Sequence, residues 1–287
     1  TEPDRKGRGS RAGGDSSGSS AGSDALVAAV TAQRNIKLTI AYDGSGYHGF
    51  QRQLNAMTVQ QMLEDKLALL FGHRLILHGA ARTDAGVHAY GQVASFRTTG
   101  SIPTERIPNA ARGLLPPDVV ILKAEDVPDD FHARIAAVSK IYVYRIHNSP
   151  NADPCLRHYT WHVPQELCVP AMHTAAQALV GTHDFSAFRG AGSSAVSPVR
   201  TLYDIAVTCR EEMVELSIRG NGFLYHMVRN IMGTLVDIGK GRRQAKDLAA
   251  ILESRNRSLA GATAPSQGLY LMAVHYPDTP GGVGTKF

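Results

Sequence analysis

The chain has 287 residues, of which 43% are hydrophobic and 19% charged, and its formal net charge is +5 at pH 7. This composition excludes a wholly disordered or collagen-like chain, and the length predicts one or two domains. No run reaches the ~18 unbroken apolar residues of a membrane helix. The basic charge is compatible with a nucleic acid as partner, although many enzymes share it.

The two ends of the chain have the composition of unstructured segments. The first 24 residues include six glycines and six serines. They carry too little apolar surface to offset the entropy of ordering, which predicts a disordered tail over 1–25. The last residues, 277–287, are predicted to form a second flexible tail. The folded body therefore lies between these two segments.

Strand and helix patterns alternate through the first part of the body. Apolar side chains at a period of two predict a half-buried strand over 36–42. Thr58 begins a capping-box pattern, and the apolar residues after it recur at helical spacing up to Gly72. The remaining patterns predict strands over 75–81, 90–98 and 119–125, and a short helix that starts at 104 and ends before 115.

The second part of the body shows a similar mixture of patterns. Alternation predicts a strand over 139–147 with Tyr142 and Tyr144 on one face. An apolar stripe predicts a helix over 223–238 that packs into the core, with Arg229 off the stripe. Further patterns predict helices over 170–180 and 244–252, a hairpin of strands 199–209 and 213–219, and a last strand over 269–276. Strands joined by hairpins, with helices on one side, are typical of an α+β fold.

A glycine-rich segment, Gly44-Ser-Gly-Tyr-His-Gly49, matches the G-x-G-x-x-G pattern of dinucleotide-binding proteins. Eight residues separate Gly49 from the predicted helix start at Thr58, so no helix N-terminus is placed to receive a pyrophosphate. We therefore expect no nucleotide cofactor. Instead we expect a glycine-rich turn that another chain or a ligand approaches.

The cysteines and one histidine pair give no support for a metal site. Cys155, Cys168 and Cys209 have no C-x-x-C spacing, so we expect free buried thiols and a reducing, cytoplasmic environment. His158 and His162 have the spacing of a zinc motif but lack its glutamate. Their aromatic and β-branched neighbours predict a strand, on which the two rings would not converge. We expect structural roles for both histidines.

One loop carries the strongest signal of chemistry. Residues 80–89 read Ala-Ala-Arg-Thr-Asp-Ala-Gly-Val-His-Ala, so a strand ends and Arg82, Asp84 and His88 follow around Gly86. An arginine near an aspartate favours the ionised carboxylate, and arginine also binds phosphates. An ionised carboxylate on a loop is a feasible nucleophile. A β-turn with an exposed salt bridge fits the spacing equally well, so both interpretations stay open at this point.

Six motifs, in order along the chain, resemble those of the TruA-type tRNA pseudouridine synthases. The loop A-R-T-D-A-G-V-H-A resembles the catalytic loop of that family. The other motifs are Tyr42–Gln51, Phe131–Arg134 with Lys140–Tyr144, Gly181–Phe188, Gly220–Asn230 and Ala264–Leu269. The resemblance covers about residues 36–276, and the two tails fall outside it.

The resemblance implies a fold and an activity. The expected fold is α+β, with two similar α/β-sandwich halves of ferredoxin or RRM type, 34–134 and 135–276. These halves would share one extended antiparallel sheet around a central cleft. The expected enzyme is an isomerase that converts uridine to pseudouridine at positions 38, 39 and 40 of the tRNA anticodon stem-loop. It is expected to need no metal and no organic cofactor, and to bind the anticodon arm as a homodimer.

The resemblance also implies roles for four residues. Asp84 matches the catalytic aspartate, and Arg82 matches the arginine that holds or replaces the flipped nucleotide. Tyr142 matches the tyrosine stacked on the target base, and Arg229 matches the arginine that pairs with the aspartate. General physical chemistry agrees, because a flipped base costs a few kcal/mol and an aromatic face returns roughly 1–3 kcal/mol by stacking.

Two other classes of function compete with this interpretation. An inactive RNA-binding protein of the same fold would not need a nucleophile such as Asp84. A phosphoester hydrolase acting through Asp84 would lack the partner carboxylates that hold Mg²⁺. The basic residues of Lys240–Arg243, with Arg255 and Arg257, are expected to be solvated charges, and contact with RNA phosphates is a secondary hypothesis for them.

Overall fold

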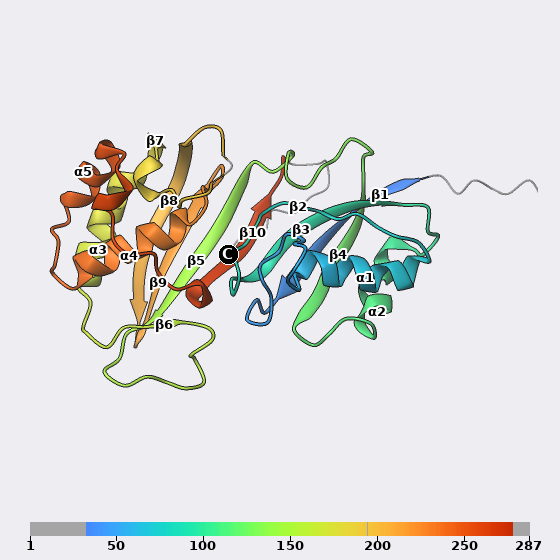
Figure 1. The fold of residues 1–287 in the computed structure, drawn as a ribbon, viewed down its shortest axis with the longest axis horizontal. Coiled ribbons are helices and arrows are strands. Elements are labelled where there is room, and N and C mark those ends of the chain that lie inside the picture. Colours follow the sequence, from blue (N-terminus) through green and yellow to red (C-terminus); the bar gives the residue numbers. More distant parts are fainter. Residues whose placement is uncertain (1–32, 194, 278–287) are drawn as a thin grey trace, which may run out of the picture. The chain divides into compact units, whose positions relative to one another are not determined.

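The computed structural model describes residues 33–193 and 195–277, and the predicted tails at 1–25 and 277–287 lie outside it except for Pro277. Within these residues the strands form one ten-stranded sheet, in the order β4-β1-β3-β10-β5-β9-β8-β7, with β2 beside β3 and β6 beside β5 (Figure 1). The strands are β1 (Arg34–Tyr42), β2 (His78–Gly79), β3 (His88–Thr98), β4 (Val119–Val127), β5 (Ser139–His147), β6 (Trp161–His162), β7 (Gly181–Asp184), β8 (Val199–Arg210), β9 (Met213–Gly220) and β10 (Leu269–His275).

The last strand of the chain lies in the middle of this sheet. β10 runs antiparallel to β5 but parallel to β3, with Tyr270 opposite His88 and Leu271 opposite Ala89. The short strand β6 is also parallel to β5. The expectation of a purely antiparallel sheet is therefore wrong at these two junctions. The reason is that tight hairpins impose antiparallel pairing, whereas β10 and β6 reach their neighbours through long connections.

Helices accompany both ends of the sheet, so the fold is mixed α/β around one shared sheet. Figure 1 shows α1 and α2 with the β4-β1-β3 end, and α3, α4 and α5 with the β9-β8-β7 end. The helices are α1 (Val59–Phe71), α2 (Ile107–Arg112), α3 (Val169–Ala176), α4 (Met227–Gly239) and α5 (Asp247–Ser254).

The strand β1 and the helix α1 form as predicted. On β1, Ile36, Leu38 and Ile40 are fully buried, which confirms the strand with one apolar face. The Thr58 hydroxyl accepts a hydrogen bond from Gln61 N and caps α1. The helix ends at Gly72, whose φ of 73° is the left-handed conformation typical of a helix end.

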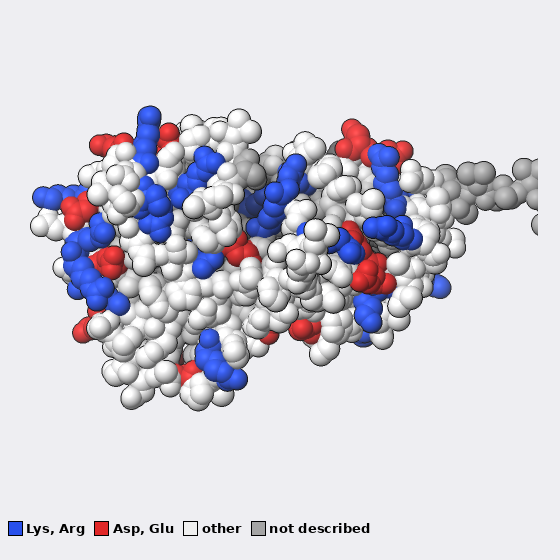
Figure 2. Space-filling model, viewed as in Figure 1, with Lys and Arg blue, Asp and Glu red and all other residues white. Residues whose placement is uncertain are grey.

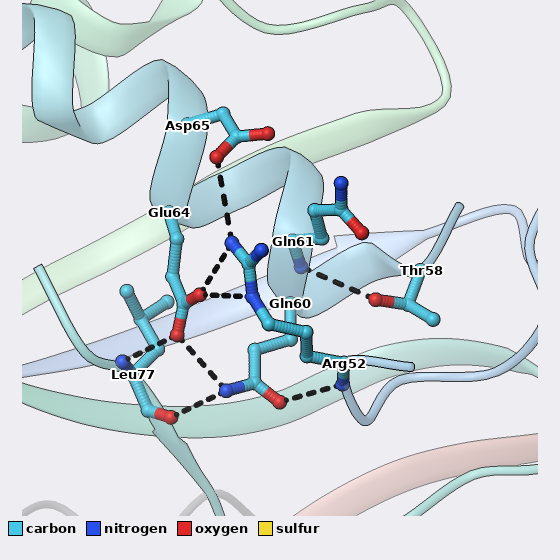
Figure 3. A network of polar contacts seen from close by, with 7 residues as sticks. All are labelled: Arg52, Thr58, Gln60, Gln61, Glu64, Asp65 and Leu77. Atoms are coloured by element: carbon cyan, nitrogen blue, oxygen red, sulfur yellow. Dashed lines mark hydrogen bonds and ion pairs between the residues drawn. The ribbon is translucent and has the colours of Figure 1, made fainter. Parts of the chain in front are cut away.

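The predicted strand over 75–81 is wrong except at β2. Side chains of α1 bind both backbone polar groups of Leu77: Leu77 N donates to Glu64 Oε1 at 3.0 Å, and Gln60 Nε2 donates to Leu77 O at 3.1 Å (Figure 3). A backbone whose donors and acceptors are already bound has no need of a neighbouring strand. The apolar pattern here reflects burial of Leu75 and Leu77, not pairing in the sheet.

Other predicted boundaries also shift. The helix predicted over 223–238 begins only at Met227, because His226 has a left-handed φ of 60° that no right-handed helix contains. Its apolar stripe is buried as expected. The helix predicted over 170–180 ends as an α-helix at Ala176 and continues as one turn of 3₁₀-helix. The strand predicted around 158–162 is reduced to the two residues of β6.

The three cysteines are free, as expected, but all three are exposed, so the prediction of buried thiols is wrong. Cys155 lies in the connection between β5 and β6, Cys168 immediately precedes α3, and Cys209 lies near the end of β8. Side chains at such positions face solvent because the core lies between elements rather than at their ends. No helix in the described part of the chain is long and apolar enough to cross a membrane.

Candidate active site

The loop before β3 holds Asp84 in a tight turn. The carbonyl of Asp84 accepts a hydrogen bond from Val87 N at 3.1 Å, and Gly86 has a φ of 75°. Only a residue without a Cβ adopts this conformation at low cost, which explains glycine two residues after the aspartate. The turn leaves the Asp84 side chain 18% exposed.

The glycine-rich segment predicted to be approached closely lies against this loop. Phe50 N donates to the carbonyl of Thr83 at 3.1 Å. A Cβ on Gly49 would lie 2.6 Å from Thr83 O, and one on Gly44 would lie 2.0 Å from Val87 O. Any side chain at either position would push the Asp84 loop away, so in this structure a segment of the same chain makes the close approach, where another chain or a ligand was expected.

Arg229 approaches Asp84 from the helix α4. It lies in the first turn of α4, and its Nη1 lies 2.9 Å from Asp84 Oδ2. Its Nε donates to Ala264 O at 2.7 Å, which fixes the direction of the guanidinium. The Arg229 side chain is 14% exposed. Ion pairs shielded from water in this way are much less screened by salt than surface pairs.

His226 is a second neighbour of Asp84. Its Nε2 lies 3.5 Å from Asp84 Oδ2, and its ring stacks on Tyr225 with centroids 3.8 Å apart. Burial lowers the pKa of His226, and Arg229 and Arg257 lower it further, against the opposing effect of Asp84. A left-handed non-glycine residue is costly, and such strain is concentrated at functional sites. The lowered pKa favours the neutral imidazole of His226 beside Asp84.

Tyr142, on β5, is buried close to Asp84. Its ring meets Phe223 edge to face, with centroids 5.1 Å apart. Burial raises the pKa of the Tyr142 phenol, and Tyr42 and Asp84 raise it further, so the hydroxyl stays protonated. A neutral phenol can donate a hydrogen bond but cannot act as a base.

These side chains line one cavity of about 700 Å³. Asp84, Arg82, Tyr142 and Arg229 all contribute to its wall, and so does His226. Arg82 is exposed, in contrast to the other three predicted site residues. A concave site of this size with few, convergent polar groups is typical of a ligand-binding pocket. The structure thus brings all four predicted residues together.

Known proteins match most of this chain. A family model for tRNA pseudouridine synthase matches residues 38–134 and 175–277. The tRNA pseudouridine synthase A of Acetivibrio thermocellus is 49% identical over 243 residues, which cover 85% of this chain and 100% of that protein. The chain belongs to the tRNA pseudouridine synthase family.

Other members of the family give similar values. The tRNA pseudouridine synthase A of Thermoanaerobacter pseudethanolicus is 46% identical over 85% of this chain and 100% of its own length. That of Halalkalibacterium halodurans is 47% identical over 82% of this chain and 90% of its own length. A crystal structure of a Cbf5-Nop10-Gar1 complex superposes with a TM-score of only 0.36 at 12% identity, over 82% of this chain and 48% of that one.

The basic residues near α4 and α5 have mixed environments in this family member. Arg257 is not a solvated charge, because its Nη2 donates to Asn230 Oδ1 at 3.0 Å and to Thr263 Oγ1 at 3.2 Å. The buried amide of Asn230 supplied no cue in the sequence for this contact. Arg255 is exposed and lies 3.4 Å from Asp184. None of the basic residues of Lys240–Arg243, nor Arg255 and Arg257, lines the Asp84 cavity.

Several cavity residues of this pseudouridine synthase family member have no predicted role. His226 precedes Arg229 by three residues within a motif that the resemblance covers, and that adjacency is the signal that could have found it. Arg134, Lys140 and Arg200 also line the cavity, and Arg200 lies outside every motif of the resemblance. Among residues 33–193 and 195–277, no three His, Cys, Asp or Glu side chains gather as metal ligands would.

Proposed function

We propose that this chain isomerises uridine to pseudouridine at positions 38, 39 and 40 of the tRNA anticodon stem-loop. The observation that carries the proposal is the Asp84 carboxylate, which is held by Arg229 at 2.9 Å and faces a cavity bordered by an aromatic ring. Membership of the family supports it, and so do the names of the relatives, which are tRNA pseudouridine synthases.

In the proposal, the cavity receives a flipped base. Chemistry at C1′ and C5 of a stacked uridine requires the base to leave its stack. In the proposal the Tyr142 ring stacks on the extruded base, while Phe223 holds that ring edge to face. Arg82 is exposed at the rim, where its flat guanidinium can replace or hold the flipped nucleotide.

Asp84 is the proposed nucleophile. The N1–C1′ bond breaks, the base turns, and a C5–C1′ bond forms, while C5 loses a proton and N1 gains one. The reaction is an isomerisation and therefore balances without an oxidant, a reductant or a cofactor. Attack at C1′, attack on the base and elimination all begin with an ionised Asp84, and the adjacent Arg229 favours that state.

The proposal extends to assembly and location. We infer two similar halves, 34–134 and 135–276, that meet at the cavity, since Asp84 belongs to the first and Arg229 to the second. We also infer a homodimer in the cytoplasm that binds one anticodon arm. The proposed enzyme needs no metal ion.

The decisive experiment maps pseudouridine in an unmodified tRNA transcript after incubation with the purified protein and no added cofactor. We expect new pseudouridine at positions 38, 39 or 40 wherever the transcript has uridine there. Tight binding of the transcript without product would instead identify an inactive RNA-binding protein of the same fold. Product only at other positions would contradict the proposed site of modification.

A further inference from the structure

The charges in the wall of the Asp84 cavity do not balance. Five cationic side chains line it, and Asp84 is the sole carboxylate among its described lining residues. The ion pair with Arg229 neutralises Asp84. Four cations then remain, and they are Arg82, Arg134, Lys140 and Arg200. Like charges gathered in one cavity destabilise the folded protein unless an anion joins them.

Lys140 is the most confined of these cations. It lies at the start of β5, is partly buried, and has no ion pair or side-chain hydrogen bond within residues 33–193 and 195–277. The charged groups that face its amine are Arg134, which precedes β5, and Arg200, from β8. The neighbouring strands place Val274 and Gly220 opposite it, and neither carries a charge.

As a consequence, the amine of Lys140 binds its proton less strongly than that of an ordinary lysine. Burial, followed by the charges of Arg134 and Arg200, lowers the pKa of Lys140 to about 8. Figure 2 shows Lys and Arg side chains gathered over the adjacent ends of β5 and β10, at the top centre of the view, with few acidic side chains among them. An anion seated among these groups would offset the repulsion and raise the pKa of Lys140 again.

The position of Lys140 relative to Tyr142 suggests which anion. The two residues are two positions apart on one strand, so they share a face of β5 and lie roughly 7 Å apart. This is about the span of one nucleotide, from its base to a backbone phosphate. A base stacked on Tyr142 would therefore have a backbone phosphate within reach of Lys140.

We propose that Arg134, Lys140 and Arg200 form an oxyanion subsite that binds a backbone phosphate of the RNA, next to the nucleotide that faces Asp84. This inference rests on the proposed function. The guanidinium of Arg200 donates through Nη1 to the carbonyls of Ser197 and Val199, which holds it in the wall of the cavity. The subsite would fix the register of the strand, because phosphate contacts position a nucleic acid without reading its sequence.

The first test measures binding of an unmodified tRNA transcript to the parent protein and to Lys140→Met between about 50 and 200 mM salt. We expect affinity to fall roughly tenfold, and the slope of log affinity against log salt to fall by about one. The control Lys123→Met removes an exposed lysine of β4 that pairs with Glu125, and we expect it to change neither quantity.

Thermal unfolding separates binding from a structural role. Lys140→Met removes a charge that is desolvated and repelled by two neighbours, so the free protein is expected to melt no lower than the parent. A variant that binds RNA weakly and melts at a lower temperature would indicate a structural role and contradict the subsite.

A pH series provides a signature specific to the amine. A bound phosphate raises the pKa of Lys140, so the parent's affinity is complete below pH 8 and weakens as pH rises through the pKa of the complex. Lys140→Arg retains a charge that does not titrate, and its affinity is expected to stay flat up to pH 9. The same weakening in both proteins would exclude Lys140 as its source.

Neutral methylphosphonates placed one at a time in an anticodon stem-loop RNA identify the phosphate. One substitution should weaken binding to the parent but not to Lys140→Met; equal losses in both proteins at every position would overturn the subsite.

Pseudouridine mapping is a separate measurement, and it distinguishes failure of the subsite from failure of the proposed function. If the parent forms pseudouridine while Lys140→Met binds normally, the subsite is wrong and the function stands. If the parent binds RNA but forms no product, the proposed function fails and the binding comparison still decides the subsite.

Discussion

Two clusters of charged side chains in this protein differ in how their charges are paired. At α1, Glu64 accepts hydrogen bonds from Arg52, Gln60 and Leu77 N, and Arg52 also approaches Asp65 (Figure 3). In the Asp84 cavity, one carboxylate stands among five cations. In the first cluster both carboxylates pair with Arg52, whereas four of the five cavity cations have no carboxylate partner among the described residues. The comparison teaches that charges paired within the chain support the fold, whereas cations without a partner point to a ligand.

The largest expected effect comes from removing the cavity's carboxylate. Asp84→Asn should abolish pseudouridine formation while tRNA affinity stays within several-fold of the parent, because phosphate contacts carry most of the affinity. Product mapping and a binding assay on the same preparation measure both quantities. Normal turnover by this variant would contradict Asp84 as nucleophile.

The next effect comes from removing the partner of that carboxylate. Arg229→Met should lower the single-turnover rate by roughly 10²–10³-fold, since a buried charge-assisted contact is lost beside the reacting group. Arg242→Met is a matched control, because Arg242 is exposed and only approaches Asp237 at 3.5 Å. Equal rates for the two variants would show that the Asp84–Arg229 pair is structural.

Arg82 tests whether an unbalanced cation acts on the flipped base. Arg82→Ala should lower turnover by about 10–100-fold and affinity much less, because its benefit arises mainly after flipping. Arg82→Lys should recover little, since an ammonium has no flat face to stack on a base. Single-turnover kinetics and the fluorescence of 2-aminopurine beside the target uridine measure these steps. If Arg82→Ala changes neither signal, Arg82 is an ordinary phosphate contact.

Glu64 tests the cluster that Arg52, Glu64 and Asp65 form at α1. Its side chain is 8% exposed, and Glu64→Ala leaves Arg52, Gln60 and Leu77 N without their acceptor, so the free energy of unfolding should fall by about 3 kcal/mol. Asp65→Ala, at a side chain that is 59% exposed, should cost less than about 1 kcal/mol. Urea denaturation measures both. A smaller loss for Glu64→Ala than for Asp65→Ala would show that the contacts of Glu64 do not stabilise the fold.

The smallest expected effect is that of metal removal. Excess EDTA should leave pseudouridine formation unchanged under conditions in which the tRNA stays folded, because Asp84 is already neutralised by Arg229 without a metal ion. Loss of activity, with recovery on adding Zn²⁺ or Mg²⁺, would refute a metal-free reaction.

Local patterns predicted those elements whose stability is itself local. The strand over 36–42 and the helix from Thr58 to Gly72 form as expected, because periods of two and of 3.6 and the capping residues act over a few positions. Patterns failed where distant groups intervened. Leu77 is bound by side chains of α1, and the helix expected from 223 starts after the left-handed His226.

The candidate site also has a part that the sequence predicted and a part that only the folded chain shows. The resemblance of short motifs named Arg82, Asp84, Tyr142 and Arg229, and their roles stay predictions. Only the folded chain shows that Asp84 and Arg229, 145 residues apart in sequence, lie within 2.9 Å of each other. Likewise, nothing adjacent to Lys140 in sequence indicates that Arg200 faces it.

By itself, the sequence determined the locally specified elements, such as the strand over 36–42 and the helix that begins after Thr58 and ends at Gly72, and the identity of the family through its motifs. The tertiary structure alone decided that β10 lies between β3 and β5, that the three cysteines are exposed, and that four cations in one cavity have no carboxylate partner among the described residues. The physical reason is range: dihedral preference and side-chain period act between near neighbours in the chain. Strand partners, solvent exposure and electric fields depend on every segment that packs nearby, whatever its position in the sequence.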